Sequence, residues 1–194
     1  RLNQRSPWDR KVRGVLVLIA IIAVSGALGS AIAWLTLATT WGWLLEALVV
    51  FSLIAQRDLY SHVRNVAVTL RRDGLEGGRR AVARIVGRDP DVLDGHGVCR
   101  AAIESCAENF ADGVVAPVFW YLVAGLPGIM IYKAVNTADS MIGHKTDRYR
   151  DFGWASARFD DLLNLIPARL SGLIVVLSAV AMQGADPRAA VRDR

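Results

Sequence analysis

An uncharged apolar stretch near the start of the chain constrains the fold more than any other sequence feature. Residues Gly14 to Leu35 form a run of 22 residues without a charged side chain. At a rise of about 1.5 Å per residue, a helix of this length crosses the roughly 30 Å hydrocarbon core of a bilayer. Small residues at Gly26, Gly29 and Ser30 give this helix a face for close packing. The preceding segment is basic, with Arg1, Arg5, Arg10, Lys11 and Arg13. The stretch therefore predicts a transmembrane helix.

Composition and charge agree with a membrane protein that carries polar loops. Of the 194 residues, 53% are hydrophobic and 21% are charged, and the formal net charge is +5. A basic excess also occurs in nucleic-acid-binding proteins, but the sequence has no aromatic-basic RNA motif or recognition-helix pattern. Cytoplasmic loops of membrane proteins carry such an excess of arginine and lysine. We therefore expect the lipid bilayer, and no nucleic acid, among the partners.

A second apolar run covers Trp43–Ala55 and is interrupted by Glu46 alone. The run is short for a span, but it crosses the bilayer if its helix continues through Arg57 and Tyr60. Residues 1–55 then form a transmembrane hairpin that returns the chain to its starting side.

Residues 56–97 are rich in arginine and predict a cytoplasmic helical loop between membrane segments. Apolar side chains recur there at helical spacing, which predicts an amphipathic helix with Leu59, Val63, Val66 and Leu70 on one face. We expect Arg72–Gly74 to end this helix and Glu76–Val86 to form another. With the N-terminus and residues 56–100 cytoplasmic, the chain is expected to be a multi-pass protein of the cell (inner) membrane.

Residues 98–171 hold a helix and then two apolar segments that are each too short for an ordinary span. The helix is expected over about Val98–Phe110, and the apolar segments over Gly113–Ala124 and Ile129–Ile142. Gly125–Gly128, with the sequence GLPG, separates the two segments. Such a break favours a re-entrant hairpin or a broken helix that lines protein or a wet cavity.

A last transmembrane segment is expected at 170–183. The predicted fold class is all-α: a polytopic membrane helical bundle with a broken or re-entrant helical hairpin and a basic cytoplasmic helical loop. We expect a single membrane domain over 1–194, with residues 98–171 as its catalytic core.

Three carboxylates lie on one face of the helix expected at 98–110. Glu104, Glu108 and Asp112 follow one another at intervals of four residues. Like charges at this spacing repel one another, so the arrangement favours a bound cation. Hard oxygen ligands suit Mg²⁺, which proteins commonly share with the phosphates of a substrate. The alternative is a solvated acidic face without a ligand.

Two further polar sets interrupt apolar surroundings downstream. In KAVNTADS, Lys133, Asn136 and Ser140 share a helix face, and Asp139 lies beside them. A lysine with an aspartate in an apolar segment suggests a phosphate contact together with a metal or base function. A buried structural ion pair is the alternative. The second set lies across a helix start and comprises Arg158, Asp160, Asp161, Asn164 and Arg169.

The second set is also open to two interpretations. Asp160 and Asp161 are either functional carboxylates or capping and dipole partners of the helix. Arg158 and Arg169 suit bidentate binding of a carboxylate or phosphate. The sequence has no GxxxxGK[ST] loop for a nucleotide. Residue chemistry alone therefore predicts an intramembrane or interfacial enzyme that uses Mg²⁺ and acts on a phosphorylated substrate.

Three blocks of the sequence stand out: ESCAENFADGVVAPVFW, YKAVNTADSMIGHKTDRYRDFG and SARFDDLLNLIPARLS. They resemble the signature blocks of the CobD/CbiB family of cobalamin biosynthesis, the adenosylcobinamide-phosphate synthases. The resemblance covers about Arg84–Ser171 and is looser before it. Ala111, Ala138 and His144 stand where serine, leucine and tyrosine are expected. Members of this family are longer, so we expect the chain to be truncated at both ends.

The resemblance implies an ATP-dependent ligase. It would join adenosylcobyric acid to (R)-1-amino-2-propanol O-2-phosphate and give adenosylcobinamide phosphate. ATP is the implied co-substrate and Mg²⁺ the implied cofactor. The implied partners are a corrinoid and a phosphorylated amino alcohol, and a homo-oligomer or a complex with other cobalamin-pathway enzymes is left open.

With this reaction in view, we expect three groups of site residues. Catalytic roles are expected for Asp139 as the base, Lys133 on a phosphate, and Glu108. Substrate and phosphate contacts are expected from Asn109, Asn136, Ser140, Arg158, Asn164 and Arg169. Metal contacts are expected from Glu104, Glu108, Asp112, Asp160 and Asp161.

Two other classes of protein fit parts of the sequence. An ion-coupled membrane transporter would use broken helices around Gly125–Gly128 and a carboxylate at membrane depth, such as Asp139. A non-catalytic membrane sensor could be built on the same scaffold. Binding of Mg²⁺–ATP by the detergent-solubilised protein would favour the ligase over both.

Overall fold

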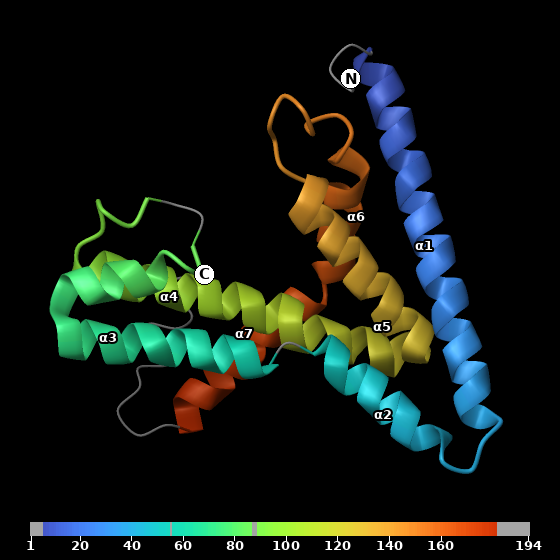
Figure 1. Ribbon diagram of the computed structural model, residues 1–194, viewed down its shortest axis with the longest axis horizontal. Helices are drawn as coiled ribbons and strands as arrows, with labels where there is room; N and C mark the ends of the chain where they lie inside the picture. Colours follow the sequence, from blue (N-terminus) through green and yellow to red (C-terminus); the bar gives the residue numbers. More distant parts are fainter. Residues whose placement is uncertain (1–5, 55, 87–88, 182–194) are drawn as a thin grey trace. The chain divides into compact units, whose positions relative to one another are not determined.

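The computed structural model describes residues 6–54, 56–86 and 89–181. These residues lie in helices, turns and loops, with no strand among them, which confirms the all-α prediction. The elements in chain order are α1 (Pro7–Leu37), α2 (Gly42–Leu53), α3 (Gln56–Val82), α4 (Gly95–Phe110), the π-helical turn η2 (Ala111–Val115), α5 (Ala116–Ile142), α6 (Trp154–Asn164) and α7 (Pro167–Ala181) (Figure 1).

Helices in the described part of the chain are long and apolar enough to cross a membrane. Two stretches qualify by length and composition. One is α1, Pro7–Leu37, and the other is Gly95–Ile142, which comprises α4, η2 and α5. A third qualifies if the bent pair of α6 and Pro167–Ser178 counts as one span. These helices confirm the prediction of a membrane helical bundle.

Packing divides the chain into two compact units. One unit comprises Arg1–Ile54 and Val115–Arg169, and the other comprises Ala55–Val114 and Leu170–Arg194. The first contains α1, α2, α5 and α6, whereas the second contains the amphipathic helix α3, its partner α4 and the apolar residues of α7 from Leu170 on. The sequence analysis expected a single membrane domain over 1–194.

In the first unit, α1 lies along α5, and α6 packs against both (Figure 1). Glycines permit the close approach of α1, as its small-residue face predicted. A Cβ on Gly29 would stand 2.7 Å from Pro127 Cα, and one on Gly14 would overlap the carbonyl oxygen of Phe152. The core of this unit comprises Leu18, Ala116, Tyr132, Val135, Ala155 and Leu163.

The break predicted at the GLPG sequence is present within α5. Ala124 has φ −139° and ψ 17°, and Gly125 has φ 61° and ψ −150°, so the helical path is interrupted there. Glycine adopts a positive φ without a steric penalty, which explains why the interruption falls on this residue. Pro127 then stands near the start of the resumed helix, where its missing N–H costs little.

Helix α2 is shorter than the expected second span. It ends at Leu53, and Ile54 is extended, so the predicted continuation through Arg57 is wrong. The helix has 12 residues, about 18 Å at the usual rise, which is too short to cross a bilayer alone. The apolar run ends two residues later, at Ala55, so a helix continued through Arg57 would gain little by burial in lipid. Glu46 accepts a 2.7 Å hydrogen bond from Tyr121 Oη on α5 and thereby ties α2 to that helix.

In the second unit, α3 and α4 pack side by side (Figure 1). Gly74, with φ 67° and ψ −159°, interrupts α3 at the predicted place. The core comprises Val66, Ala81, Val82, Val98, Ala101 and Ala102, with Leu70 packed against it. Val66 and Leu70 thus lie on the predicted apolar face, whereas the side chain of Leu59 lies outside the described residues.

Some helix boundaries differ from the predictions. The segment expected as a helix to Val86 is helical only to Val82 and continues as turns. Helix α4 begins at Gly95 instead of Val98, because the carboxylate of Asp94 caps it by accepting a 2.7 Å hydrogen bond from the Gly97 amide. The last helix begins at Pro167, a residue favoured in the first turn, and residues 182–183 lie outside the described part.

Candidate functional site

A buried carboxylate on α6 is held by amide side chains from two helices. Asp160 is 7% exposed. Its Oδ1 accepts a 3.3 Å hydrogen bond from Asn136 Nδ2 on α5, and its Oδ2 accepts a 2.9 Å bond from Asn164 Nδ2 on α6. Asn164 Oδ1 in turn accepts a 3.0 Å bond from the hydroxyl of Tyr132, which is fully buried on α5. We call these four residues the Asp160 network.

Helical spacing explains how the sequence builds the Asp160 network. Tyr132 and Asn136 stand four residues apart on α5, and Asp160 and Asn164 stand four apart on α6. Residues at this spacing share a helix face, so two packed helices bring both pairs together. Because apolar core residues surround the network, an unmet hydrogen bond in it would be costly. The network therefore fixes how α5 and α6 meet.

A partly exposed rim adjoins the Asp160 network. Asp139 is half-buried one turn after Asn136, and its charge and that of Asp161 act on Asp160 by electrostatic repulsion. Asp161 is exposed and lies 3.6 Å from Arg158, measured from its Oδ2 to Nη1. The rim, formed by Asp139, Asp161 and Arg158, thus contains two carboxylates whose negative charge one arginine partly offsets. This arrangement suits a cationic group.

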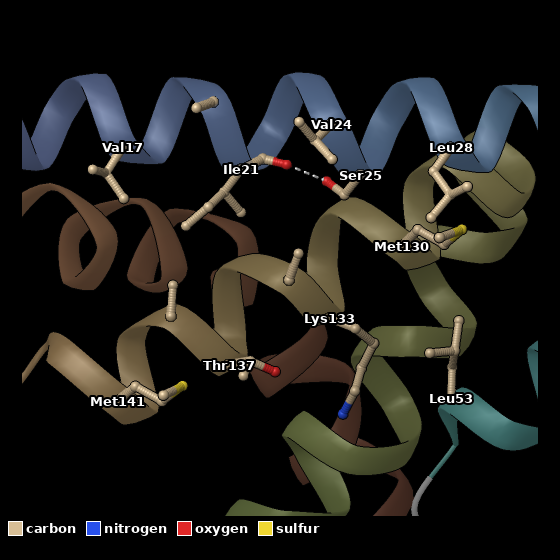
Figure 2. Close-up of a pocket in the computed structure, with 13 residues that line it drawn as sticks. Val17, Ile21, Val24, Ser25, Leu28, Leu53, Met130, Lys133, Thr137 and Met141 are labelled. Atoms are coloured by element: carbon tan, nitrogen blue, oxygen red, sulfur yellow. Dashed lines mark hydrogen bonds between the residues drawn. The ribbon is translucent and has the colours of Figure 1, made fainter.

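Lys133 belongs to a different surface of α5. It lines an apolar groove of about 770 Å³ between α1, Leu53 of α2 and α5. Figure 2 shows Thr137 and Met141 along the same helix, opposite Val17 and Ile21 of α1. Ser25 also lines the groove, with its hydroxyl donating 2.7 Å to the Ile21 carbonyl oxygen. Among the described lining residues Lys133 is the one charged side chain, and a charge in such surroundings is a functional candidate.

The three predicted carboxylates of the α4 region are not equally exposed. Glu104 and Glu108 are exposed on α4, and Asp112 is half-buried in η2. Asn109 donates to the backbone oxygen of Ser105 at 2.8 Å, so its amide nitrogen is engaged within its own helix. Glu104 also lines a groove of about 650 Å³, with His96, Cys99, Arg100, Ile103 and Ala107. A π-helical turn next to such a face is a common feature of functional sites.

The described residues do not form a metal cage. No group of three or more histidine, cysteine, aspartate or glutamate side chains within residues 6–54, 56–86 and 89–181 comes close enough to hold an ion. Mg²⁺ is usually bound by one or two carboxylates plus water and substrate phosphates. Exposed carboxylates one helical turn apart, such as Glu104 and Glu108, fit that partial shell. In contrast, both oxygens of Asp160 are already used by amides, so it fits a positioning role better than a metal contact.

Two other predicted residues lie at the margins of these groups. Arg169 is exposed and donates from Nη1 to the carbonyl oxygen of Leu165, one turn earlier. Ser140 is exposed on the last turns of α5. The structure therefore brings Asn136, Asp160 and Asn164 into one network but places Lys133 on a separate groove.

One member of the network was absent from the sequence predictions. Tyr132 was treated as part of an apolar segment, although its hydroxyl closes the network on Asn164. Its position four residues before Asn136 was an available signal, because the two must share a helix face. A buried tyrosine hydroxyl normally requires a hydrogen-bond partner.

Known proteins are similar in sequence to this chain along most of its length. A family model described as CobD/Cbib protein matches residues 1–194. A protein of Sinorhizobium sp named cobalamin biosynthesis protein CobD is 55% identical over 189 residues, 96% of this chain and 58% of the relative. A protein of the same name from Rhizobium meliloti (strain 1021) is 57% identical over 177 residues, 91% of this chain and 54% of the relative.

A third relative of that name, from Rhodobacter capsulatus, is 52% identical over 186 residues, 92% of this chain and 59% of the relative. The chain thus spans less than two thirds of the length of the curated relatives it matches. No solved structure matches the chain significantly. The residues of the Asp160 network lie inside the blocks that suggested the family, and the family model covers them all: the chain belongs to the CobD/CbiB family.

Proposed function

We propose that the protein is the ATP-dependent amide ligase that joins adenosylcobyric acid to (R)-1-amino-2-propanol O-2-phosphate, and that this chain carries part of its membrane-embedded core. Family membership and relatives named cobalamin biosynthesis protein support a role in cobalamin biosynthesis. The ligase chemistry rests on the resemblance and on the polar groups described above.

The reaction needs activation of a carboxylate and deprotonation of an amine. A carboxylate is a poor electrophile, so its oxygen attacks the γ-phosphorus of ATP and releases ADP, leaving an acyl phosphate. The amine nitrogen then attacks the acyl carbon, and inorganic phosphate leaves as the amide C–N bond forms. Because the amine enters as an ammonium ion, a base must first accept one of its protons.

The observation that carries the proposal is the clamping of Asn136 by Asp160. The Nδ2 end of Asn136 faces Asp160, to which it donates its hydrogen bond. The Oδ1 end is then left as an acceptor, one turn from the carboxylate of Asp139. Two acceptors at this spacing suit the ammonium of the amino alcohol, with Asp139 as the base and Asn136 as its orienting partner.

The remaining polar groups suit the phosphate-bearing ends of the substrates. Glu104, Glu108 and Asp112 would hold Mg²⁺ together with the phosphates of ATP, and the ion would offset the phosphate charge. Lys133 would contact a phosphate. Arg158 and Arg169 would bind the phosphate of the amino alcohol, for which the planar guanidinium is well shaped.

Product formation in detergent tests this function. The full-length protein would be incubated with adenosylcobyric acid, aminopropanol phosphate and Mg²⁺, with and without ATP, and the amide read by mass spectrometry. We expect ATP-dependent product, and a loss of about 10²–10⁴-fold in rate for Asp139→Asn, the usual contribution of a general base. Asp147→Asn is the matched control, because its side chain is 93% exposed on the following loop.

Two results would contradict the proposal. Absence of amide with folded full-length protein and bound substrates would favour a transporter or a sensor, for which the broken helix α5 is also suitable. Equal rates for Asp139→Asn and the parent would be compatible with ligase activity but would contradict the role of Asp139 as the base.

A further inference from the structure

A small groove lies where the first turns of α1 meet the start of α6. It has a volume of about 400 Å³ and is lined by Trp8, Lys11, Val12, Val15, Leu16 and Trp154. Both indoles are accessible, with Trp8 75% and Trp154 48% exposed. The groove lies within the first unit, away from the Asp160 network.

The groove has a cationic aromatic end and an apolar end. At the first, the ammonium of Lys11 lies 5.7 Å from the centre of the Trp154 ring, in a cation–π contact. At the second, Val15 and Leu16 are 37% and 60% exposed. This polarity matches a molecule with an anionic head and a hydrocarbon tail.

The groove also lies at the correct depth for such a molecule. Its cationic end precedes Gly14, where the uncharged part of α1 begins, and its apolar end lies within the uncharged part. Trp8 and Leu16 are eight residues apart, about 12 Å along the helix. Tryptophan collects at the membrane–water interface, where the ring meets both water and lipid. The groove therefore crosses from the headgroup layer into the acyl layer.

Among the basic residues in the first turns of α1, Lys11 is the one that lines the groove. Arg10 points instead to the loop before α6, where its Nη2 lies 2.7 Å from Asp151 Oδ2 and its Nη1 donates to the Asp147 carbonyl oxygen at 3.2 Å. Arg13 is exposed on the same turns and adds positive potential. The local charge thus favours an anionic headgroup over a zwitterionic one.

We propose that this groove binds one anionic phospholipid, with its phosphate on Lys11 between the two indoles and an acyl chain along Val12, Val15 and Leu16. The lipid would bridge α1 to α6 and so brace the helix that carries Asp160. The proposal is independent of the ligase chemistry, because it concerns a surface that no substrate role uses.

Native mass spectrometry of the protein in detergent tests the site directly. Phosphatidylglycerol or phosphatidylcholine of the same acyl length is added, and the retained lipid is counted. We expect one phosphatidylglycerol to bind preferentially, and Lys11→Gln to weaken it about five-fold, since one lysine near an anionic surface contributes about that factor. Lys145→Gln, an exposed lysine on the loop after α5, is the matched control and should bind like the parent.

A second variant shows whether weaker lipid binding could result from misfolding. Trp154→Leu retains an apolar side chain but removes the aromatic face, so we expect weaker phosphatidylglycerol binding with helical circular dichroism unchanged. Equal retention of the two lipids by the parent would overturn the proposal. Full phosphatidylglycerol preference in Lys11→Gln would do the same, because the headgroup would then lie elsewhere.

Discussion

Two groups of helices, α1, α2, α5 and α6 of the first unit and the pair α3 and α4 of the second, place polar and apolar side chains in opposite ways. In the first group, large apolar side chains face outward, such as Val24 at 67% and Leu122 at 77% exposure, while Asp160 is 7% exposed inside. In the α3–α4 pair, Val66 and Val82 are buried at 3% and 0%, and arginines cover the outside of α3. The apolar residues of α7 in the second unit resemble the first group, with Leu177 59% exposed.

The difference corresponds to two ways in which helices associate, one suited to water and one suited to lipid. In water, burial of apolar surface drives helices together, so an amphipathic stripe suffices for α3 and α4. In lipid, the surroundings are as apolar as the helix, and association depends on close packing and interhelical hydrogen bonds. Glycine contacts along α1 supply the close packing, and the Asp160 network supplies interhelical hydrogen bonds. Variants in each unit can therefore test the comparison.

The largest effect is expected from filling a glycine contact on α1. A Cβ at Gly29 would stand 2.7 Å from Pro127 Cα and 2.9 Å from Pro127 N, both backbone atoms that cannot move independently of α5. We expect Gly29→Ala to destabilise the first unit by about 1–3 kcal/mol, the usual cost of overpacking. Thermal unfolding in detergent, followed by tryptophan fluorescence, would measure the change.

Gly26→Ala on the same helix is the matched control. Its Cβ would meet only the side chain of Ile131, at 3.3 Å from Cδ1, and that methyl group can move aside. We expect a clearly smaller change. Equal melting temperatures for Gly29→Ala and the parent would mean that close approach of α1 to α5 contributes little.

An intermediate effect is expected from removing one hydrogen-bonding hydroxyl in each unit. Tyr132→Phe removes the 3.0 Å bond to Asn164 Oδ1. Ser105→Ala removes the 2.9 Å bond to the Ile85 carbonyl oxygen and the 3.2 Å bond that the hydroxyl accepts from Asn109 Nδ2. We expect a cost of about 1 kcal/mol per bond, the usual net value. Unfolding in urea is expected to reveal the loss of stability in Ser105→Ala, which lies in the α3–α4 unit. Thermal unfolding in detergent is expected to reveal the loss in Tyr132→Phe.

A double variant sharpens this prediction. Asn164→Ala combined with Tyr132→Phe should cost less than the sum of the two single changes, because both remove the same bond. Strict additivity would show that Tyr132 and Asn164 stabilise the unit independently.

The smallest effect is expected at the surface of α3. Arg72 Nε lies 2.8 Å from Asp73 Oδ1, and this hydrogen bond, with the charges of Arg72 and Arg80, lowers the pKa of Asp73. A lowered pKa stabilises the fold above the unfolded value of about 3.9, and the contribution is lost as pH falls through the folded value. The pair is exposed to solvent, so we expect only a slight difference in stability between Arg72→Gln and the parent from pH 7 to 5, and none once the pH lies below the folded pKa of Asp73.

Arg71→Gln is the control for this pH series, because it removes the same charge one residue earlier. We expect its difference from the parent to lack the acid dependence. A difference that persists in Arg72→Gln at a pH low enough to protonate Asp73 would point to lost packing of the arginine side chain instead of the ion pair.

Much of the fold follows from local sequence rules. The uncharged run of α1 and the breaks at Gly74 and Gly125 were predictable, because length, hydropathy and glycine conformation act within a few residues. The end of α2 at Leu53 was not, since no glycine or proline marks it. Helix ends of this kind depend on what the flanking residues contact.

Within the candidate site, the residue types and the helix face on which each one stands follow from local sequence. The carboxylates of α4, the lysine of α5 and the aspartates of α6 were all identifiable as candidates. Their partners depend on tertiary packing: Asn136 and Asn164 hold Asp160, Tyr132 completes the network, and Lys133 stands along a separate groove. Spacing along a helix is a local property, whereas a hydrogen bond between α5 and α6 depends on how two helices separated in sequence pack together.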